Sequence, residues 1–484
     1  MRVLLVSWEY PPVVVGGLGR HVHALARELA AAGHEVVVLC RQPTGSDAST
    51  HPTSDTVVDA VRVLRAAEDP IHLEFARDLV AWTLAMGHTL VRTALTRLGD
   101  WRPEVVHAHD WLVAHPATTL ADVLGVPLVA TLHATEAGRH SGWLPGPLNR
   151  AVHSVEWALA NRADTVITCS RAMRTEAAQL YDLDPAAIHV VHNGIDARGW
   201  RVRRDRAAAV RERFAPGPGP VLVFVGRLEY EKGVQDLLAA LPRIRRRHPG
   251  TRLLVAGTGT QREFLAGEVR RLRLGRAVSF TGHLPDRDLA ALLVAADAVV
   301  LPSRYEPFGI VALEAAAAGA TLVASTAGGL GELVVEGETG WSFPPADVPA
   351  LAAAVDRALH APAVAANHAR TARARLREDF AWPTLAARTA ALYAAAENGG
   401  ERALPRPKIA TGDLLAGAAL LRRRPLLAGH VRDGGALGRG GLVVRDPVPH
   451  HARGGAHGDA VVRDVPAHDG VGAEHAAAPD AGAP

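Results

Sequence analysis

Short apolar runs alternate along the chain with longer stretches in which apolar residues recur at helical spacing. Val3 to Ser7 is such a run and precedes a Pro-Pro turn, and a second run covers 35–40. Between them, 18–32 has the apolar spacing of a helix that Gly33 ends. Apolar runs without strict alternation are typical of parallel strands covered by helices on both faces. The pattern therefore predicts an α/β fold.

The alternation of strand and helix occurs twice along the chain. In the first half we expect a long helix over 71–98 and further strands at 104–107, 127–132, 165–169 and 188–191. In the second half we expect strands at 221–225, 252–256, 277–280, 297–301 and 321–324. This series predicts two doubly wound, Rossmann-like domains of similar size.

Composition places the boundaries between these domains. We expect an N-terminal domain over 1–192, a linker over 193–220, a C-terminal domain over 221–381 and a crossover helix over 382–397. The linker is expected because an Arg-rich stretch ends there in A-P-G-P-G-P.

The last segment of the chain, 401–484, has a different composition. Gly and Pro occupy 22 of its 84 positions, and no Phe, Trp or Tyr follows Tyr393. Such a segment buries too little apolar area to offset its ordering entropy. We therefore expect it to be disordered.

Charge and cysteine content exclude several classes of protein. The 53 basic residues, which comprise 51 arginines and two lysines, nearly balance 50 acidic residues, so the formal net charge is only +3. This balance argues against a nonspecific nucleic-acid binder. Two cysteines, Cys40 and Cys169, exclude a disulfide scaffold and a zinc site of four thiolates. Both close strand-like runs, so we expect them in the core.

Hydropathy indicates where the chain resides. No apolar stretch reaches the roughly 18 residues that a membrane-spanning helix needs. The N-terminal apolar run is too short for a signal peptide, since Arg2 and Glu9 bound it. We therefore expect a cytoplasmic protein, with a peripheral membrane contact left open.

Glycines follow the first strand and precede the first helix. In open parallel α/β sheets, ligands bind at the carboxyl ends of the strands. The run V-V-G-G-L-G-R places Gly16, Gly17 and Gly19 there, where their backbone N–H groups favour an anion. The alternative is a tight turn between strand and helix.

Two cations follow the first strand of the second half. Arg227 and Lys232 lie five residues apart around a turn, and Gly233 opens the next helix. Two cations with helix N–H groups suit a diphosphate, and they neutralise it without Mg²⁺. The alternative is a solvated basic turn whose partners are Glu229 and Glu231.

Two carboxylates surround the start of a helix further along the chain. Glu306 follows the expected strand at 297–301, and Glu314 lies about two helical turns later if the helix begins near Pro307. Such a pair accepts hydrogen bonds from hydroxyls of two rings of one ligand. The alternatives are a helix N-cap for Glu306 and a buried backbone acceptor for Glu314. A glycine pair, Gly328-Gly329, follows the next strand.

Histidines follow two strands of the first half. His109 and Asp110 end the segment H-A-H-D-W, and His133 lies in T-L-H-A-T-E. His107 and His109 also raise the question of a metal site, but no third ligand at suitable spacing is evident. We therefore predict no metal.

Taken together, these segments resemble the family 4 retaining glycosyltransferases of the GT-B fold. The resemblance is carried by W-E-Y-P-P-V-V-V-G-G-L-G, H-A-H-D-W, H-A-T-E, V-H-N-G-I-D, G-R-L-E-Y-E-K, E-P-F-G-I-V-A-L-E and G-G-L-G-E, in family order over residues 1–397. It is closest to bacterial glycogen-synthase-like α-1,4-glucosyltransferases, and the wording H-A-T-E-A-G-R-H-S-G-W resembles the actinobacterial enzymes of glycogen or methylglucose lipopolysaccharide synthesis.

The resemblance implies roles for individual residues. It makes Arg227 and Lys232 the ligands of a nucleotide-sugar diphosphate, Glu306 an acceptor from the donor sugar, and Glu314 an acceptor from the ribose. His133 would lie near the reacting carbon, so the implied catalytic residues are His133, Arg227, Lys232 and Glu306. The implied nucleotide-sugar-binding residues are Gly16, Gly17, Gly19, Arg227, Lys232, Glu306, Gly309, Ile310, Glu314, Gly328 and Gly329. No tightly bound cofactor is implied.

The expected reaction is glucosyl transfer from ADP-glucose or UDP-glucose to an α-1,4-glucan or a glucosylated lipid. Four tryptophans of the first half are candidates for stacking on the acceptor sugar, with core packing as the alternative: Trp82, Trp101, Trp111 and Trp143. Alternatives are a transferase that uses GDP-mannose or another donor on a lipid acceptor, a nucleotide-sugar 2-epimerase, and a catalytically silent glycan-binding protein. The sequence leaves the oligomeric state open.

Overall fold

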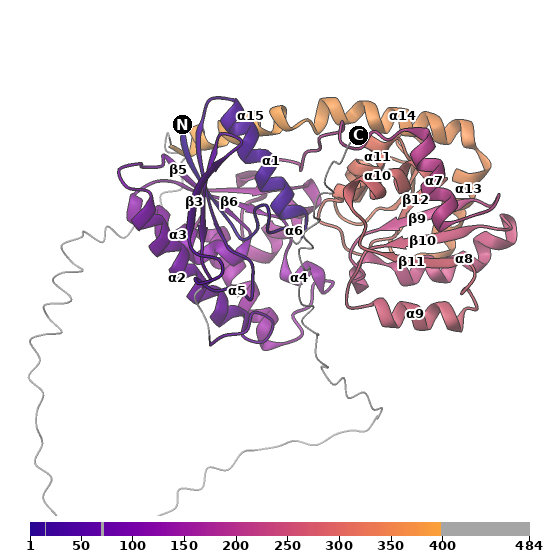
Figure 1. The fold of residues 1–484 in the computed structure, drawn as a ribbon, viewed down its shortest axis with the longest axis horizontal. Helices are drawn as coiled ribbons and strands as arrows, with labels where there is room; N and C mark the ends of the chain where they lie inside the picture. Colours follow the sequence, from indigo (N-terminus) through magenta and orange to yellow (C-terminus); the bar gives the residue numbers. More distant parts are fainter. Residues whose placement is uncertain (15, 69–71, 398–484) are drawn as a thin grey trace, which may run out of the picture. The chain divides into compact units, whose positions relative to one another are not determined.

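The computed structural model describes residues 1–14, 16–68 and 72–397, which form two parallel sheets with helices on their faces (Figure 1). The expected disordered segment, 401–484, lies outside the described residues. Among those that are described, none of the helices combines the length and the apolar character needed to cross a membrane.

The N-terminal half forms an eight-stranded sheet in the order β3-β4-β2-β1-β5-β6-β7-β8. Its strands are β1 (Arg2–Ser7), β2 (Glu35–Arg41), β3 (Ser54–Val58), β4 (Val61–Ala66), β5 (Val105–His109), β6 (Leu128–Leu132), β7 (Thr165–Thr168) and β8 (Ile188–Val190). All neighbours are parallel except β3, which runs antiparallel to β4. In the register, Val3 pairs with Val36 on one side and Val105 on the other.

Helices connect most of these strands. They are α1 (Gly17–Ala31), α2 (Leu79–Arg97), α3 (Ala114–Leu124), α4 (Glu136–Arg139), α5 (Pro147–Arg162) and α6 (Arg171–Tyr181), with short 3₁₀ turns at Trp111–Val113 and Pro185–Ala187.

The second half forms a six-stranded, all-parallel sheet in the order β11-β10-β9-β12-β13-β14. Its strands are β9 (Val221–Val225), β10 (Arg252–Ala256), β11 (Val278–Gly282), β12 (Ala298–Leu301), β13 (Leu322–Ser325) and β14 (Trp341–Phe343). Its helices are α7 (Arg204–Phe214), α8 (Val234–Arg247), α9 (Arg262–Arg271), α10 (Asp286–Ala295), α11 (Ile310–Ala318), α12 (Leu330–Leu333), α13 (Val348–His360) and α14 (Pro362–Asp379), with a 3₁₀ turn at Tyr230–Lys232. The predicted architecture of two doubly wound sheets is confirmed.

The central strands are mostly apolar because helices cover both faces of each sheet. Val3, Leu4, Leu5 and Val6 are fully buried although successive side chains point to opposite faces. Cys40 and Cys169 are also buried and free, as their positions at the ends of apolar runs predicted.

The last described helix, α15 (Trp382–Glu397), returns from the second sheet to pack beside α1 (Figure 1). Trp382, Leu385 and Tyr393 join the apolar cluster of the first sheet. The Tyr393 hydroxyl and Nδ1 of His107 also share a hydrogen bond of 2.7 Å. This helix occupies the range expected for the crossover helix.

One expectation for local structure was wrong, and two strand features were not predicted. The helix expected over 71–98 begins only at Leu79, because the preceding residues form a turn in which the Glu74 N–H donates to the Asp78 carboxylate at 3.0 Å. The hairpin of β3 and β4 was missed, because β3 is largely exposed and its turn uses Asp59 and Ala60 at positive φ instead of the usual Asn-Gly. The short strand β14 was missed as well.

Part of the expected linker is also a packed helix. Within 193–220, helix α7 buries Ala207 and Val210. Arg211 fixes it to the second sheet by donating to the Ala295 carbonyl at 2.8 Å and to Asp297 at 2.9 Å. Charged residues of this stretch therefore form ion pairs that hold α7 in place. The domain boundaries remain a prediction.

Candidate active site

The residues singled out in the sequence follow the carboxyl ends of six strands. In the first sheet they come after β1, β5 and β6, and in the second after β9, β12 and β13. In each sheet these three strands are direct neighbours. The topology therefore gathers glycines and histidines at one edge, and cations and carboxylates at the other.

The loops after β9 and β12 are joined by an ion pair between Lys232 and Glu306. Lys232 Nζ lies 2.9 Å from Glu306 Oε2, and the side chains are only 15% and 18% exposed. The Ser303 hydroxyl donates to the same carboxylate oxygen at 3.1 Å. Partial burial strengthens the attraction between the two charges and fixes both at one place.

A tight turn after β9 puts Lys232 in this position. Gly233 has φ +69° and caps the N-terminus of α8, as expected. A Cβ at Gly233 would collide with the carbonyl oxygen of Pro302, at the end of β12. The two loops thus approach each other at a distance that only glycine permits.

Arg227 lies in the same loop, but more than half of its side chain is exposed to solvent. Its guanidinium pairs with Glu231 at 3.4 Å, and the side chain is 58% exposed. An exposed pair of this kind contributes little to stability, so exchanging Glu231 for an anionic ligand costs little.

The glycine pair after β13 packs against the backbone of Glu306. Gly329 N–H donates to the Glu306 carbonyl at 2.9 Å. Gly328 has φ +51°, and a Cβ there would collide with the same carbonyl oxygen. The side chain of Leu330 packs at Gly309, which caps α11. The expected start of this helix near Pro307 was wrong, since α11 begins at Ile310 and leaves Glu306 in the loop.

Glu314 lies on α11 and is almost fully buried. Burial raises its pKa to about 7; Arg20 opposes this shift and Asp286 adds to it. Arg20, from α1, bridges both acids, at 3.2 Å to Glu314 and 2.8 Å to Asp286. The sequence analysis singled out neither Arg20 nor Asp286.

The glycine loop after β1 meets the same helix. Gly17 is the first residue of α1, and a Cβ there would lie 2.6 Å from Cδ1 of Ile310. Gly16 N–H donates to the Glu9 carboxylate at 3.0 Å, and Gly19 packs against Glu9. Gly17 and Ile310 are therefore neighbours, as two members of one binding site require.

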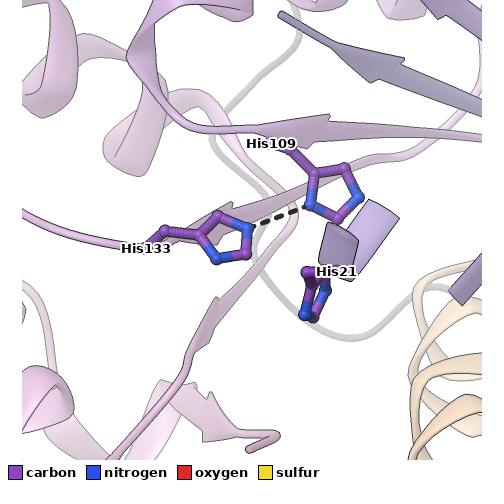
Figure 2. Close-up of side chains that lie close together, drawn as sticks. All are labelled: His21, His109 and His133. Atoms are coloured by element: carbon purple, nitrogen blue, oxygen red, sulfur yellow. Dashed lines mark hydrogen bonds between the residues drawn. The ribbon is translucent and has the colours of Figure 1, made fainter. Parts of the chain in front are cut away.

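His133 follows β6 and lies in a cluster with His109 and His21, shown in Figure 2. His133 Nε2 is 3.2 Å from His109 Nδ1, and the His21 and His133 rings are 4.8 Å apart. The His133 N–H donates to Asp110 at 2.7 Å. Burial lowers the pKa of His133 to about 4 and holds those of His21 and His109 well below their usual range. All three rings are therefore neutral at pH 7.

This cluster is also a group of potential metal ligands, with one nitrogen from each ring within 4.8 Å of the others. The sequence analysis missed His21 as the third member. His107, which it considered beside His109, instead contacts Tyr393 and Thr131, both at 2.7 Å. The prediction that the protein binds no metal stays a prediction.

Tyr305, next to Glu306, contacts the segment that follows His133. Its hydroxyl accepts from the Thr135 N–H at 3.3 Å and donates to Glu176 at 2.9 Å. Close by, the Ser170 hydroxyl donates to the Pro307 carbonyl at 2.7 Å. These contacts bring the His133 and Glu306 loops together, and sequence spacing gave no sign of them.

Of the four tryptophans considered for acceptor stacking, two are core residues. Trp82 is 1% exposed and Trp111 is 7% exposed, so stacking on a ligand was wrong for both. Trp101 is half-buried and donates from Nε1 to Glu35 at 3.1 Å. Trp143 is 69% exposed.

Two protein families match the chain, one for each half. Residues 15–198 match Glycosyltransferase Family 4, and residues 205–376 match Glycosyl transferases group 1. The boundary between the matches falls between the two sheets.

Similar proteins agree with these matches. The chain is 57% identical over 411 residues to a glycogen synthase of Mycobacterium tuberculosis, covering 84% of this chain and 97% of the relative. It is 31% identical to an alpha-maltose-1-phosphate synthase of Mycolicibacterium smegmatis, over 81% and 99% of the two chains. The structure of a sucrose-phosphate synthase from Thermosynechococcus elongatus superposes with a TM-score of 0.71 at 26% identity, covering 82% of this chain and 100% of that one. This chain therefore belongs to the family 4 glycosyltransferases and is a hexosyltransferase with the GT-B fold.

Proposed function

We propose that this chain transfers glucose, with retention of anomeric configuration, from ADP-glucose or UDP-glucose to an α-1,4-glucan or a related glucosyl acceptor. The observation that carries the proposal is the partly buried Lys232–Glu306 pair at the ends of β9 and β12. The 57% identity to a protein named glycogen synthase supports glucose and a glucan as the substrates.

The cations act on the leaving group. When the bond between the sugar carbon and the diphosphate breaks, negative charge grows on the phosphate oxygen. Lys232 and Arg227 would lie beside that oxygen and stabilise it more in the transition state than in the ground state. One such preorganised contact lowers the activation barrier by about 2–4 kcal/mol.

The reacting carbon becomes positive as the diphosphate leaves. Since burial keeps the pKa of His133 at about 4, its ring is neutral at pH 7 and does not repel this charge. Glu306 accepts hydrogen bonds from sugar hydroxyls through the carboxylate that Lys232 and Ser303 hold in place. His133 and Glu306 therefore orient the sugar, and neither of them adds positive charge beside its reacting carbon.

Retention follows from attack on the face that the leaving group vacates. The acceptor hydroxyl oxygen forms the new bond to the sugar carbon, while the bond to the diphosphate oxygen breaks. The hydroxyl proton passes to that phosphate oxygen, so the products are the lengthened acceptor and a nucleoside diphosphate. No protein nucleophile is assigned to this step.

Glu314 would hold the nucleotide ribose. Its carboxyl group is buried at the start of α11 and is already engaged by Arg20 through one oxygen, Oε1. The other oxygen remains able to accept from a ribose hydroxyl. Arg20, from α1, would then hold the Glu314 carboxyl group in place for the ribose.

Acceptors other than a glucan are alternatives within the proposal. A relative at 31% identity is named alpha-maltose-1-phosphate synthase, a name that gives a small phosphorylated product. A glucosylated lipid acceptor would bring the chain to a membrane surface.

A donor screen tests the proposal. ADP-, UDP- and GDP-glucose and GDP-mannose are each incubated with the chain, with and without maltooligosaccharide, and nucleoside diphosphate release is measured. We expect rapid release from ADP-glucose or UDP-glucose that depends on the maltooligosaccharide and lengthens it. Release only from GDP-mannose, or an epimer formed without acceptor, would contradict the proposal.

A further inference from the structure

The segment 136–149 comprises α4, the loop that follows it and the first residues of α5. It begins three residues after His133 and presents an exposed indole. Trp143 is 69% exposed, although a tryptophan usually buries most of its surface. The neighbouring Leu148 is 47% exposed. Together they place an apolar surface on a loop of the N-terminal half.

Backbone hydrogen bonds brace the loop that carries Trp143. Its backbone N–H donates to the His140 carbonyl at 3.1 Å, and the Gly142 N–H donates to Ala137 at 2.8 Å. Ser141 and Gly142 both have positive φ, which turns the chain sharply before the indole. A braced loop loses less backbone entropy when a ligand binds to its side chains.

Polar side chains of the same segment form a connected group. Glu136 accepts from Asn149 at 2.6 Å and lies 3.3 Å from His140, and Arg139 lies 3.6 Å from the same carboxylate. The side chains of Arg139 and His140 are 38% and 41% exposed. The segment thus offers hydrogen-bond donors and acceptors together with an aromatic face.

The far side of this segment is packed against the donor-binding half. A Cβ at Gly138 would collide with the Tyr305 ring, and Thr135 N–H donates to the Tyr305 hydroxyl. Tyr305 directly precedes Glu306, and the Glu136 N–H is anchored by the buried Glu156 at 2.9 Å. Segment 136–149 is therefore tied to the residues proposed to hold the donor sugar.

We propose that segment 136–149 is an acceptor-binding subsite for an α-glucan, in which the indole of Trp143 stacks on the apolar face of a glucose ring. This inference rests on the proposed function. A pyranose ring has one apolar face and a rim of hydroxyls, which matches an aromatic ring accompanied by a carboxylate, an amide and a guanidinium. The indole contributes to binding the acceptor and has no part in breaking the donor bond.

Trp143→Ala tests the subsite, with Trp157→Ala as the matched control, since Trp157 is also exposed but lies outside the segment. Kinetics are measured with maltoheptaose as acceptor and the preferred nucleotide-glucose as donor. For Trp143→Ala we expect the KM for maltoheptaose to rise about tenfold, with the donor KM and the kcat at saturating acceptor within about twofold of wild type. Trp143→Phe should recover part of the loss, and Trp157→Ala should behave as wild type.

The inference is overturned if Trp143→Ala keeps the wild-type KM for maltoheptaose, or if Trp157→Ala raises that KM equally. Because the indole is exposed, loss of folding is not expected, and circular dichroism of the variant verifies it. Failure of the proposed function looks different, since the wild-type protein would then fail to lengthen maltoheptaose with either nucleotide-glucose.

Discussion

Lys232→Ala is expected to lower kcat by about a hundredfold or more, while the protein remains folded. The substitution removes the cation proposed to stabilise the departing diphosphate. It also leaves the Glu306 carboxylate, 18% exposed, without its ionic partner. Steady-state kinetics with the preferred nucleotide-glucose measure the loss, and thermal unfolding verifies the fold.

Two further variants separate the role of Lys232 from a general loss of charge. Arg271→Ala removes one cation of an exposed pair with Glu268 on α9 and should leave kcat unchanged. Lys232→Arg keeps the charge but replaces a compact ammonium with a planar fork, so only part of the activity should return. Wild-type kcat in Lys232→Ala would show that the diphosphate is bound elsewhere.

Glu306→Ala is expected to have an effect of similar size, about a hundredfold or more on kcat, for a different reason. Here the carboxylate that accepts from the donor sugar is lost, and Lys232 and Ser303 lose the group that orients them. Glu306→Gln keeps the shape and an acceptor oxygen but not the charge, and should fall between wild type and Glu306→Ala. The same assay measures all three proteins.

The control for this series is Glu268→Ala, which removes a carboxylate paired with Arg271 far along the sequence from the site. It should keep wild-type kcat and KM. If Glu306→Ala were as active as Glu268→Ala, the assignment of Glu306 to the donor sugar would be wrong. A rise in donor KM with unchanged kcat would show instead that Glu306 binds the donor equally in the ground state and the transition state.

The sequence predicted the strands that carry the site more reliably than the outer parts of the sheets. β9 and β10 match their predicted ranges because each is a continuous apolar run between turn residues. β3 was not predicted because nearly all of its side chains are exposed to solvent, so no hydrophobic pattern marks it. β14 is only three residues long and is defined by pairing with β13.

Within the site, the strand-end rule found the residues that each loop contributes. It placed Lys232 and Glu306 after two separate strands, and the structure shows that these strands are neighbours and joins the two residues in an ion pair. It could not find Arg20, which meets Glu314 across 294 positions of sequence. Contacts of this kind depend on how loops pack in three dimensions, and no local spacing encodes them.

The tryptophans show the same limit. Sequence placed Trp82 and Trp143 in one group of candidate sugar-binding residues, yet Trp82 packs edge-to-face on Trp8 in the core at 4.9 Å. Trp143 remains exposed because the residues before it turn the chain outward. Burial, which only the fold reveals, separates a core residue from a binding residue.

A crystal structure of the chain with ADP or UDP bound tests the central claim most directly. We predict diphosphate oxygens within about 3.2 Å of both Lys232 Nζ and the Arg227 guanidinium, with a ribose hydroxyl at the Glu314 carboxylate. A well-ordered nucleotide bound elsewhere, with the Lys232–Glu306 pair untouched and Arg227 still on Glu231, would contradict the account.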